Sequence, residues 1–382
     1  MSARILFAGG GTGGHLYPAL NLGDAVKRAD PAAETYFVGA QRGVESRVLP
    51  EKGVQHQLLP LEPIRRARPW ENWKLVPAMF GAWGRLRGIF GAFRPQVAVG
   101  TGGYASGPAV LYALMRGVPI ALQEQNSYPG FVTRKLAGRA RQLHLAFPEA
   151  RKYLKPGPKT EIFEYGNPIT PPDFHVDRAE ARARFGLGSG TVCLVTGGSQ
   201  GARAVNEALL SDLRGVAEKR LPPPPAGFEI LWATGTANYD AIQAKLGEIG
   251  RVDWVKPVAY IQDMPGALAS ADFAISRAGA MSLAELCAWG VPAILVPLPT
   301  AAANHQHHNA VALADAGAAL LVPEAELGQG RLWGEMMKLA ADPAERARLA
   351  AKAKERGKPD AADRIAAELL RLVGGQAPQT GA

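Results

Sequence analysis

The sequence predicts two α/β domains, each built on a doubly wound parallel sheet. Short apolar runs alternate with helical stretches along the chain, from "RILFAG" to "AILVPLP". Strict alternation of strands and helices is typical of parallel sheets joined by helical crossovers. Both halves also open with an apolar strand, a glycine turn and an alanine-rich helix, in "ILFAGGGTGGHLYPAL" and "VCLVTGGSQGARAVNEAL". This repetition indicates two domains rather than one large sheet.

The expected strands are short apolar runs with helices between them. Those of the first half lie at residues 4–9, 34–40, 97–102, 120–125 and 142–147. Those of the second half lie at residues 192–198, 228–235, 252–258, 273–279 and 293–299.

The domain boundary is expected between residues 154 and 174, where proline and glycine cluster and helical periodicity lapses. We expect a first domain over residues 1–166, joined by a C-terminal helix at about 358–375, and a second domain over 167–357. Ligands of two-domain α/β proteins bind at the carboxyl ends of strands and at domain interfaces. A cleft between the two halves is therefore the expected site.

The composition is that of a soluble globular protein, with 47% hydrophobic and 20% charged residues. No run approaches the ~20 apolar residues of a membrane-spanning helix, and the N-terminus becomes a strand too soon for a signal peptide. Cys193 and Cys287 lie in apolar segments, so we expect buried reduced thiols. A net charge of +9 indicates an anionic partner, which is nucleic acid, a membrane surface or a phosphorylated substrate.

The stretch "GGGTGG", residues 9–14, joins the first strand to a helix. It fits the dinucleotide pattern G-x-G-x-x-G, but the second strand ends in Gly39 and Ala40 without the acidic residue that would hold a ribose. Glycines at a helix start instead let free N–H groups approach an oxyanion such as a diphosphate. A tight turn without ligand is the alternative interpretation.

His15 follows this turn at the start of the helix. An imidazole with a pKa of about 6.5 can take a proton from a sugar hydroxyl at neutral pH. The alternative is a helix-start side chain bonded to the backbone. Two further glycine turns, residues 99–108 and 195–206, indicate more than one phosphate-bearing ligand.

A third helix start, in "SRAGAMSLAE", follows the strand "DFAIS". The free N–H groups of Gly279 to Ser282 can bind phosphate there, and Glu285 lies one turn on, where it can accept both hydroxyls of a ribose. The alternative is a glutamate favoured in the first turn by the helix dipole alone.

Residues 65–94 combine many Lys and Arg residues with large aromatic ones, and the chain has no acidic residue from Asn72 to Gln123. One apolar helical stripe is expected, flanked by cations, which is typical of a surface that meets anionic lipid headgroups. The alternative is simple packing on the sheet. The stripe comprises Trp73, Val76, Phe80, Trp83 and Phe90, and its flanking cations are Lys74, Arg85 and Arg87. No nucleic-acid module is recognisable, so no nucleic-acid partner is expected.

Seven motifs in this order resemble those of the MurG family of bacterial glycosyltransferases, over roughly residues 3–370. The motifs are "GGGTGGHLYPAL", "GTGGYASGP", "QEQN", "GNP", "GGSQGARAVN", "SRAGAMSLAEL" and "HQHHNA". The resemblance implies the GT-B architecture, in which the first domain binds the acceptor and the membrane and the second binds the donor. It also implies inverting transfer of N-acetylglucosamine from UDP-N-acetylglucosamine to the C4 hydroxyl of the muramoyl sugar of lipid I, undecaprenyl-diphosphate-MurNAc-pentapeptide. The product, lipid II, serves peptidoglycan synthesis and thereby cell shape and division, at the cytoplasmic face of the inner membrane.

The resemblance also assigns site residues, with His15 as the candidate general base. It implies no cofactor. The residues matched to donor binding are Thr12, Gly13, Gly14, Asn126, Ser199, Ile261, Ala280, Met281, Ser282, Leu283, Ala284, Glu285 and Gln306. Those expected at the acceptor diphosphate are Gly102, Gly103, Tyr104 and Ser106.

Two positions depart from the family pattern. The family commonly has "HEQN", so Gln123 replaces a histidine, and acid–base work falls to His15. Many members have an arginine near the uracil where this chain has Thr170, which leaves base recognition to Ile261 and backbone groups. The run "NHQHHN" lacks a carboxylate or cysteine at ligand spacing, so no metal is expected.

Two other functions stay open on the sequence alone. One is another UDP-sugar enzyme of the same fold, a lipid glycosyltransferase or a sugar-nucleotide epimerase. The other is a nucleotide-binding protein without catalysis.

Overall fold

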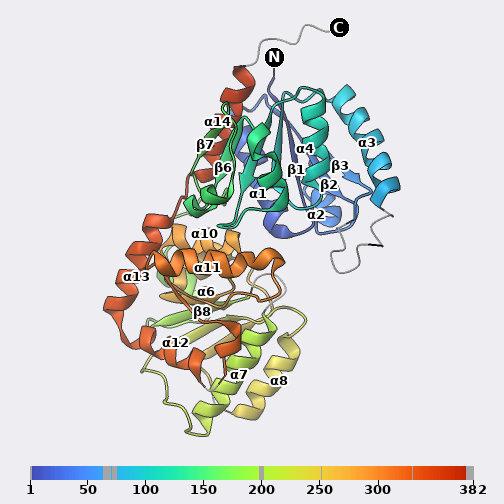
Figure 1. The fold of residues 1–382 in the computed structure, drawn as a ribbon. Helices are drawn as coiled ribbons and strands as arrows, with labels where there is room; N and C mark the ends of the chain where they lie inside the picture. Colours follow the sequence, from blue (N-terminus) through green and yellow to red (C-terminus); the bar gives the residue numbers. More distant parts are fainter. Residues whose placement is uncertain are drawn as a thin grey trace. The chain divides into compact units, whose positions relative to one another are not determined.

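The chain folds into two compact units, Met1–Pro171 with Pro359–Ala382 and Pro172–Lys358. The computed structural model describes residues 2–62, 70, 75–197, 202–250, 252–328 and 330–375 (Figure 1). The C-terminal helix α14 (Ala361–Gly374) belongs to the first unit, where it packs against α1 (Gly13–Ala29).

The first unit has a parallel sheet whose strands, within the described residues, stand in the order β3-β2-β1-β4-β5-β6-β7. Phe7 and its neighbours in β1 are fully buried, because both faces of the sheet are covered. The strands are β1 (Arg4–Gly9), β2 (Glu34–Ala40), β3 (His56–Leu59), β4 (Val97–Gly102), β5 (Ile120–Glu124), β6 (Gln142–Leu145) and β7 (Glu161–Phe163).

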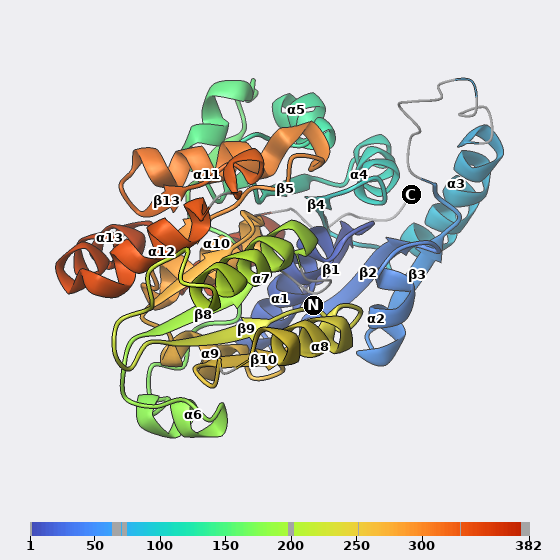
Figure 2. The same ribbon diagram turned by 90° about the horizontal axis from the view of Figure 1, so that it is seen from below.

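Two apolar layers sandwich this sheet. On one face it packs against α3 (Leu75–Ala92), α4 (Ser106–Met115) and α5 (Phe131–Leu136). On the other it packs against α1, α2 (Glu45–Glu51) and α14. Figure 2 shows α3, α4 and α5 on one side of the sheet and α1 and α2 on the other. Two short 3₁₀ segments, Ala137–Arg139 and Pro148–Tyr153, complete the unit.

The second unit has a parallel sheet with the strand order β10-β9-β8-β11-β12-β13 in its described part. Figure 1 shows α10 and α11 on one side of it and α7, α8 and α12 on the other. The strands are β8 (Val192–Thr196), β9 (Glu229–Ala233), β10 (Val255–Val258), β11 (Phe273–Ser276), β12 (Ala293–Leu295) and β13 (Ala319–Leu321). The helices are α6 (Arg178–Arg184), α7 (Arg203–Ala217), α8 (Tyr239–Ile249), α9 (Met264–Ser270), α10 (Ala280–Trp289), α11 (His305–Asp315), α12 (Arg331–Ala341) and α13 (Pro343–Arg356).

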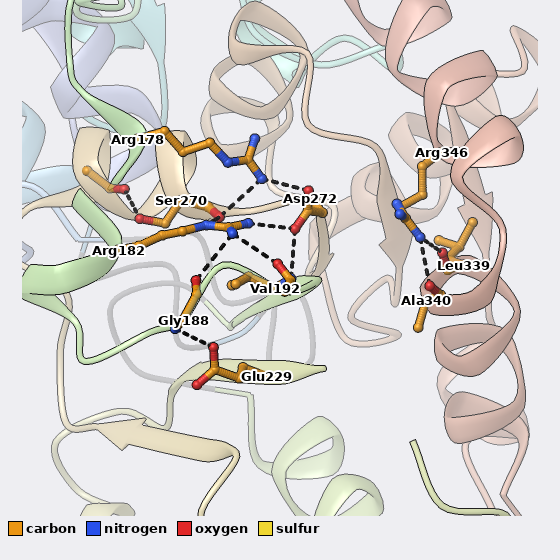
Figure 3. A network of polar contacts seen from close by, with 12 residues as sticks. Arg178, Arg182, Gly188, Val192, Glu229, Ser270, Asp272, Leu339, Ala340 and Arg346 are labelled. Atoms are coloured by element: carbon orange, nitrogen blue, oxygen red, sulfur yellow. Dashed lines mark hydrogen bonds and ion pairs between the residues drawn. The ribbon is translucent and has the colours of Figure 1, made fainter. Parts of the chain in front are cut away.

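A buried arginine ties α6 to the sheet of the second unit. The Arg182 guanidinium donates to the Asp272 carboxylate at 2.8 Å and to backbone carbonyls, including that of Gly190 at 2.9 Å (Figure 3). The same carboxylate accepts from Arg178 and from the amide of Val192, the first residue of β8. Burial lowers the pKa of Arg182, but its carboxylate and carbonyl partners compensate for the loss of water.

The fold class expected from the sequence is confirmed, and each expected strand is present. Three further strands, β3, β7 and β13, were not predicted. The strands β3 and β7, with the sequences HQLL and EIF, begin with polar residues, and β13 follows the alanine-rich α11, so none of them forms a separate apolar run. Cys193 and Cys287 are buried free thiols, as expected.

Candidate functional site

The glycine turns after β1 and β4 pack against each other at the carboxyl ends of the strands of the first sheet. These strands are neighbours, and their chains continue into helices on opposite faces, which makes this edge a topological switch point. A β-carbon at Gly9 would lie 1.9 Å from Oγ1 of Thr101, and one at Gly103 would lie 1.9 Å from the carbonyl oxygen of Gly10. Only glycine allows this close approach of the two turns.

A buried carboxylate that the sequence did not reveal binds the first glycine turn from within. Glu45 is fully buried, and both of its oxygens lie 2.9 Å from the amide nitrogen of Gly11. A β-carbon at Gly10 would come within 2.4 Å of the same carboxylate, and one at Gly11 within 2.7 Å of the Tyr104 ring. The expectation that the amides of this turn are open to an anion is therefore wrong for Gly11. Internal packing accounts for three of the glycines.

Gly13 and Gly14 form the first turn of α1, where helix geometry leaves the amides without acceptors inside the helix. No described residue accepts a hydrogen bond from either amide, and Gly14 is exposed. These two amides, with the exposed Thr12 before them, therefore stay the candidates for the predicted anion site.

The His15 imidazole lies against the second glycine turn. Its Nδ1 is 3.0 Å from Oγ1 of Thr12, and its backbone carbonyl accepts from the Thr101 hydroxyl at 2.7 Å. A β-carbon at Gly102 would lie 2.6 Å from Cδ2 and 3.1 Å from Nε2 of the ring. The ring is half-buried, with its orientation fixed on two sides.

The second turn has the left-handed backbone that only glycine adopts freely, with φ of +95° at Gly102 and +77° at Gly103. The Tyr104 hydroxyl donates to the carbonyl of Arg42. Ser106, at the start of α4, is fully buried, and its hydroxyl donates to the carbonyl of Gly103 at 3.0 Å. The Ser106 side chain therefore stabilises the turn and is closed to solvent.

Asn126 is held by a carboxylate that sequence reasoning also missed. Glu124 accepts from the backbone amide of Asn126 at 3.1 Å, from its side-chain amide at 3.4 Å, and from the amide of Gly130 at 2.9 Å. Burial raises the pKa of Glu124, and these hydrogen bonds oppose the rise. Gln123, on the same strand, is fully buried, whereas Thr170 is exposed.

In the second unit, β8 and β11 are neighbours at the corresponding switch point. The turn from β11 into α10 is held from two sides. The buried guanidinium of Arg277 donates to the carbonyls of Val296 and Pro297 and pairs with Glu324. The Asn309 side chain donates to the carbonyl of Ala278 at 3.2 Å. Gly279 is the N-cap of α10, so the amides of Met281 and Ser282 have no acceptor inside the helix, whereas the Leu283 amide donates to the Gly279 carbonyl at 3.0 Å.

Glu285 lies in the second turn of α10. Burial raises the pKa of its carboxyl to about 7, and no other cause contributes to the shift. A carboxyl that is desolvated in this way, with no ion-pair partner among the residues that the structure describes, is costly in the absence of ligand, which is common for binding residues.

The remaining expected donor residues have different surroundings. The Gln306 side-chain carbonyl accepts from the amide of Leu298 at 3.0 Å, which directs its NH₂ group away from that amide. Ile261 is buried, with 4% of its surface exposed. On α10, the Leu283 side chain lies in the core, while Met281, Ser282 and Ala284 are half-buried. Ser199 lies outside the described residues.

The three histidines near α11 form no metal centre with carboxylates or thiols. Nδ1 of His305 lies 2.7 Å from the carbonyl of Ala302, and the His307 and His308 rings meet edge to face. Among the residues that the structure describes, no group of His, Cys, Asp or Glu could hold a metal ion.

The helices α3, α4 and α5 expose large apolar side chains on the face away from the sheet. Phe80 is 77% exposed, and Met115 on α4 is 67% exposed. The expected stripe divides, because Phe90 is in the core and Trp83 packs edge to face on Tyr112. Trp73, Lys74 and the Val76 side chain lie outside what the structure describes.

No helix in the described ranges is long and apolar enough to cross a membrane.

Comparison with known proteins matches both halves of the chain to members of one protein family. The N-terminal domain model of glycosyltransferase family 28 matches residues 5–145, and the C-terminal domain model matches residues 192–365. The UDP-N-acetylglucosamine–N-acetylmuramyl-(pentapeptide) pyrophosphoryl-undecaprenol N-acetylglucosamine transferase of Moorella thermoacetica is 38% identical, over 97% of this chain and 99% of its own length. The transferase of the same name from Salinibacter ruber is also 38% identical, over 98% of each chain. The crystal structure of Acinetobacter baumannii MurG superposes with a TM-score of 0.74 at 25% identity, over 97% of this chain and 99% of that one.

Proposed function

The chain belongs to glycosyltransferase family 28, among its N-acetylglucosamine transferases, and on that premise we propose the reaction and the roles of its residues. The protein transfers N-acetylglucosamine from UDP-N-acetylglucosamine to the C4 hydroxyl of the muramoyl sugar of lipid I, with inversion, and makes lipid II for peptidoglycan synthesis. The observation that carries this function is the 38% identity to transferases of that name over nearly the full length of both chains. The alternative of another UDP-sugar enzyme has no support among these relatives.

The direct test is to incubate the protein with labelled UDP-N-acetylglucosamine and a short-chain lipid I analogue. The expected product is a disaccharide lipid that carries the label. Release of free N-acetylglucosamine, or of an epimerised sugar nucleotide without disaccharide, would refute the proposal.

The donor nucleotide is assigned to the turn that starts α10. The first-turn amides of α10 are oriented toward an incoming diphosphate, and the helix dipole favours its negative charge. The Glu285 carboxylate would accept hydrogen bonds from both ribose hydroxyls, and these would offset the cost of its desolvation. Ile261 would pack on the uracil, and Gln306 and Asn126 would meet the sugar.

His15 is assigned as the general base. In the tautomer in which Nδ1–H donates to Oγ1 of Thr12, Nε2 carries the lone pair that accepts the proton of the acceptor hydroxyl. The contact with Thr12 holds the ring in this orientation. The amides of Gly13 and Gly14, with the turn at Gly102, Gly103 and Tyr104, are the candidates for contact with diphosphate.

The outer face of α3, α4 and α5 is assigned to an anionic membrane surface, at the cytoplasmic side of the inner membrane. Phe80 and Met115 would enter the interfacial region, and Arg85 and Arg87 would meet the lipid headgroups. From residue 72 to 148 the only acidic residue is Glu124, which is buried, so no surface carboxylate opposes this attraction. An acceptor that is anchored in the membrane by its lipid can be reached only by an enzyme that contacts the membrane surface. No nucleic-acid partner is proposed.

A further inference from the structure

Three buried amide side chains form a continuous hydrogen-bonded chain behind the second glycine turn. Gln123, Gln125 and Asn167 are 0%, 2% and 3% exposed. Nε2 of Gln125 donates to the carbonyl of Thr101 at 2.7 Å and also to Oε1 of Gln123. Nε2 of Gln123 donates to Oδ1 of Asn167 at 3.2 Å, and Nδ2 of Asn167 donates to the carbonyl of Gln125 at 3.1 Å.

The direction of each amide in this chain is fixed by its ends. The backbone carbonyls of Thr101 and Gln125 can only accept hydrogen bonds, so the groups that face them must be the NH₂ groups of Gln125 and Asn167. Oδ1 of Asn167 must then accept from Gln123, and Oε1 of Gln123 must accept from Gln125. Gln123 is thus required to donate once and to accept once.

The hydrogen-bonded series of Gln123, Gln125 and Asn167 ends beside the His15 ring. With its NH₂ group directed at Thr101, the Gln125 side chain turns its Oε1 toward Gly102. The position that a β-carbon of Gly102 would take lies 3.6 Å from this oxygen and 2.6 Å from Cδ2 of His15. The imidazole and Gln125 therefore lie against the same glycine, and a shift of the Thr101 carbonyl would move the surface on which the imidazole rests.

We propose that Gln123 is a positioning residue for His15. Gln123 acts through Gln125 and the Thr101–Gly102 turn, and its amide supplies one donor and one acceptor, as a neutral imidazole would. This inference rests on the proposed role of His15 as the base. It accounts for glutamine at a position where the family commonly has histidine, because a neutral histidine also donates at one nitrogen and accepts at the other. Gln123 does not touch substrate.

A histidine introduced at position 123 would stay neutral, as the neighbouring strand illustrates. His144 on β6 pairs with Gln123 in the sheet register, is fully buried, and has its pKa lowered to about 3 by burial. Among the other titratable groups nearby, the Glu124 carboxyl is bonded to Asn126 and Gly130, and that of Glu45 to Gly11.

The test compares Gln123→Leu, Gln123→Glu and Gln123→His in the full chain, with lipid I analogue and UDP-N-acetylglucosamine. We expect the Leu and Glu variants to lose kcat by about 10- to 100-fold, since small displacements of a catalytic group have effects of that order. The KM for UDP-N-acetylglucosamine should change less than kcat, because the nucleotide is assigned to the second unit and Asn126, which would meet the sugar, is held by Glu124 and not by Gln123. The His variant should recover most of the kcat that the Leu variant loses.

Gln142→Leu is the matched control, because Gln142 is equally buried in the same sheet and its side-chain amide also donates a hydrogen bond, to the backbone carbonyl of Glu368. This variant should lose thermal stability but keep kcat. Equal kcat losses in Gln142→Leu and Gln123→Leu, or a His variant no better than the Glu variant, would overturn the positioning role. If Gln123→Leu does not fold, the kcat of Gln123→Glu is compared with that of Gln123→His, and a higher kcat in the His variant supports the positioning role. Unchanged kcat in His15→Ala would instead remove the proposed base, which separates the two failures.

Discussion

Replacement of Glu285 with glutamine should stabilise the ligand-free protein at alkaline pH and leave it unchanged in acid. The Glu285 carboxyl on α10 has its pKa raised to about 7 by burial alone, from a usual value of 4.5. Below pH 4.5 the carboxyl is protonated in both the folded and unfolded chains. As the pH rises toward 7, the unfolded chain releases this proton while the folded chain retains it, so the free energy of unfolding decreases.

The size of the effect follows from the pKa difference. A shift of one pKa unit corresponds to about 1.4 kcal/mol, so the shift at Glu285 lowers the stability by about 3 kcal/mol once the pH exceeds 7. Glutamine has nearly the same shape and no charge, and it avoids this cost. The expected difference between Glu285→Gln and the parent chain therefore grows from near zero at pH 4.5 to about 3 kcal/mol at pH 8.

Urea denaturation at pH 4.5, 6 and 8 would measure this difference. The transition to follow is that of the second unit, which carries Glu285 and which added UDP should shift to higher urea. Glu207→Gln is the matched control in the same unit, because Glu207 is an exposed partner of Arg203 on α7 and exposed pairs contribute little. A Glu285→Gln chain that gains the same stability at every pH, or none at pH 8, would show that the carboxyl is not desolvated as described. The same variant should bind UDP more weakly, since its amide keeps only one, uncharged acceptor oxygen for the two ribose hydroxyls.

The remaining predictions concern the other assigned groups. His15→Ala should reduce kcat by about 10²- to 10⁴-fold with little change in UDP-N-acetylglucosamine affinity by calorimetry, because base catalysis contributes an effect of that order. Affinity for UDP-N-acetylglucosamine, whose diphosphate does not titrate near neutrality, should rise from pH 5.5 to 8 as Glu285 ionises, and Glu285→Gln should abolish this dependence. Glu45→Gln should lower the free energy of unfolding by about 1–3 kcal/mol in urea denaturation, because a buried acceptor of the Gly11 amide is weakened. Phe80→Asp with Arg87→Glu should abolish co-sedimentation with anionic liposomes while activity on a soluble acceptor persists; unchanged co-sedimentation would exclude this face.

The sequence predicted the fold because each domain repeats a strong local signal. Buried parallel strands read as continuous apolar runs, and their alternation with helices specifies crossovers. The strands that were missed, β3, β7 and β13, lie at the outer part of each sheet, where three or four residues suffice for pairing. The equally short β12 was predicted because it begins the apolar run "AILVPLP", whereas β3 and β7 begin with polar residues.

The sequence could not predict the groups that hold the site residues in place. Glu45 is 34 positions from the Gly11 amide that it binds, and Asn167 is 44 positions from Gln123. These contacts arise only when neighbouring strands bring their carboxyl ends together, and no local pattern specifies them. The motif "QEQN" marked Asn126 through the family resemblance, but the two residues before it, Glu124 and Gln125, act through tertiary contacts.

The glycines of the first turn acquire a different meaning once Glu45 and Tyr104 are in place. The Gly11 amide cannot bind an oxyanion while it is bonded to the Glu45 carboxylate, because the negative charge of that carboxylate lies where the anion would bind. Gly9, Gly10 and Gly11 instead let two turns and a buried carboxylate pack at van der Waals distance. This packing sets where α1 begins, and therefore where the His15 ring lies. The anion binding proposed for this turn therefore falls to the amides of Gly13 and Gly14, while Gly9, Gly10 and Gly11 serve the packing beside the His15 ring.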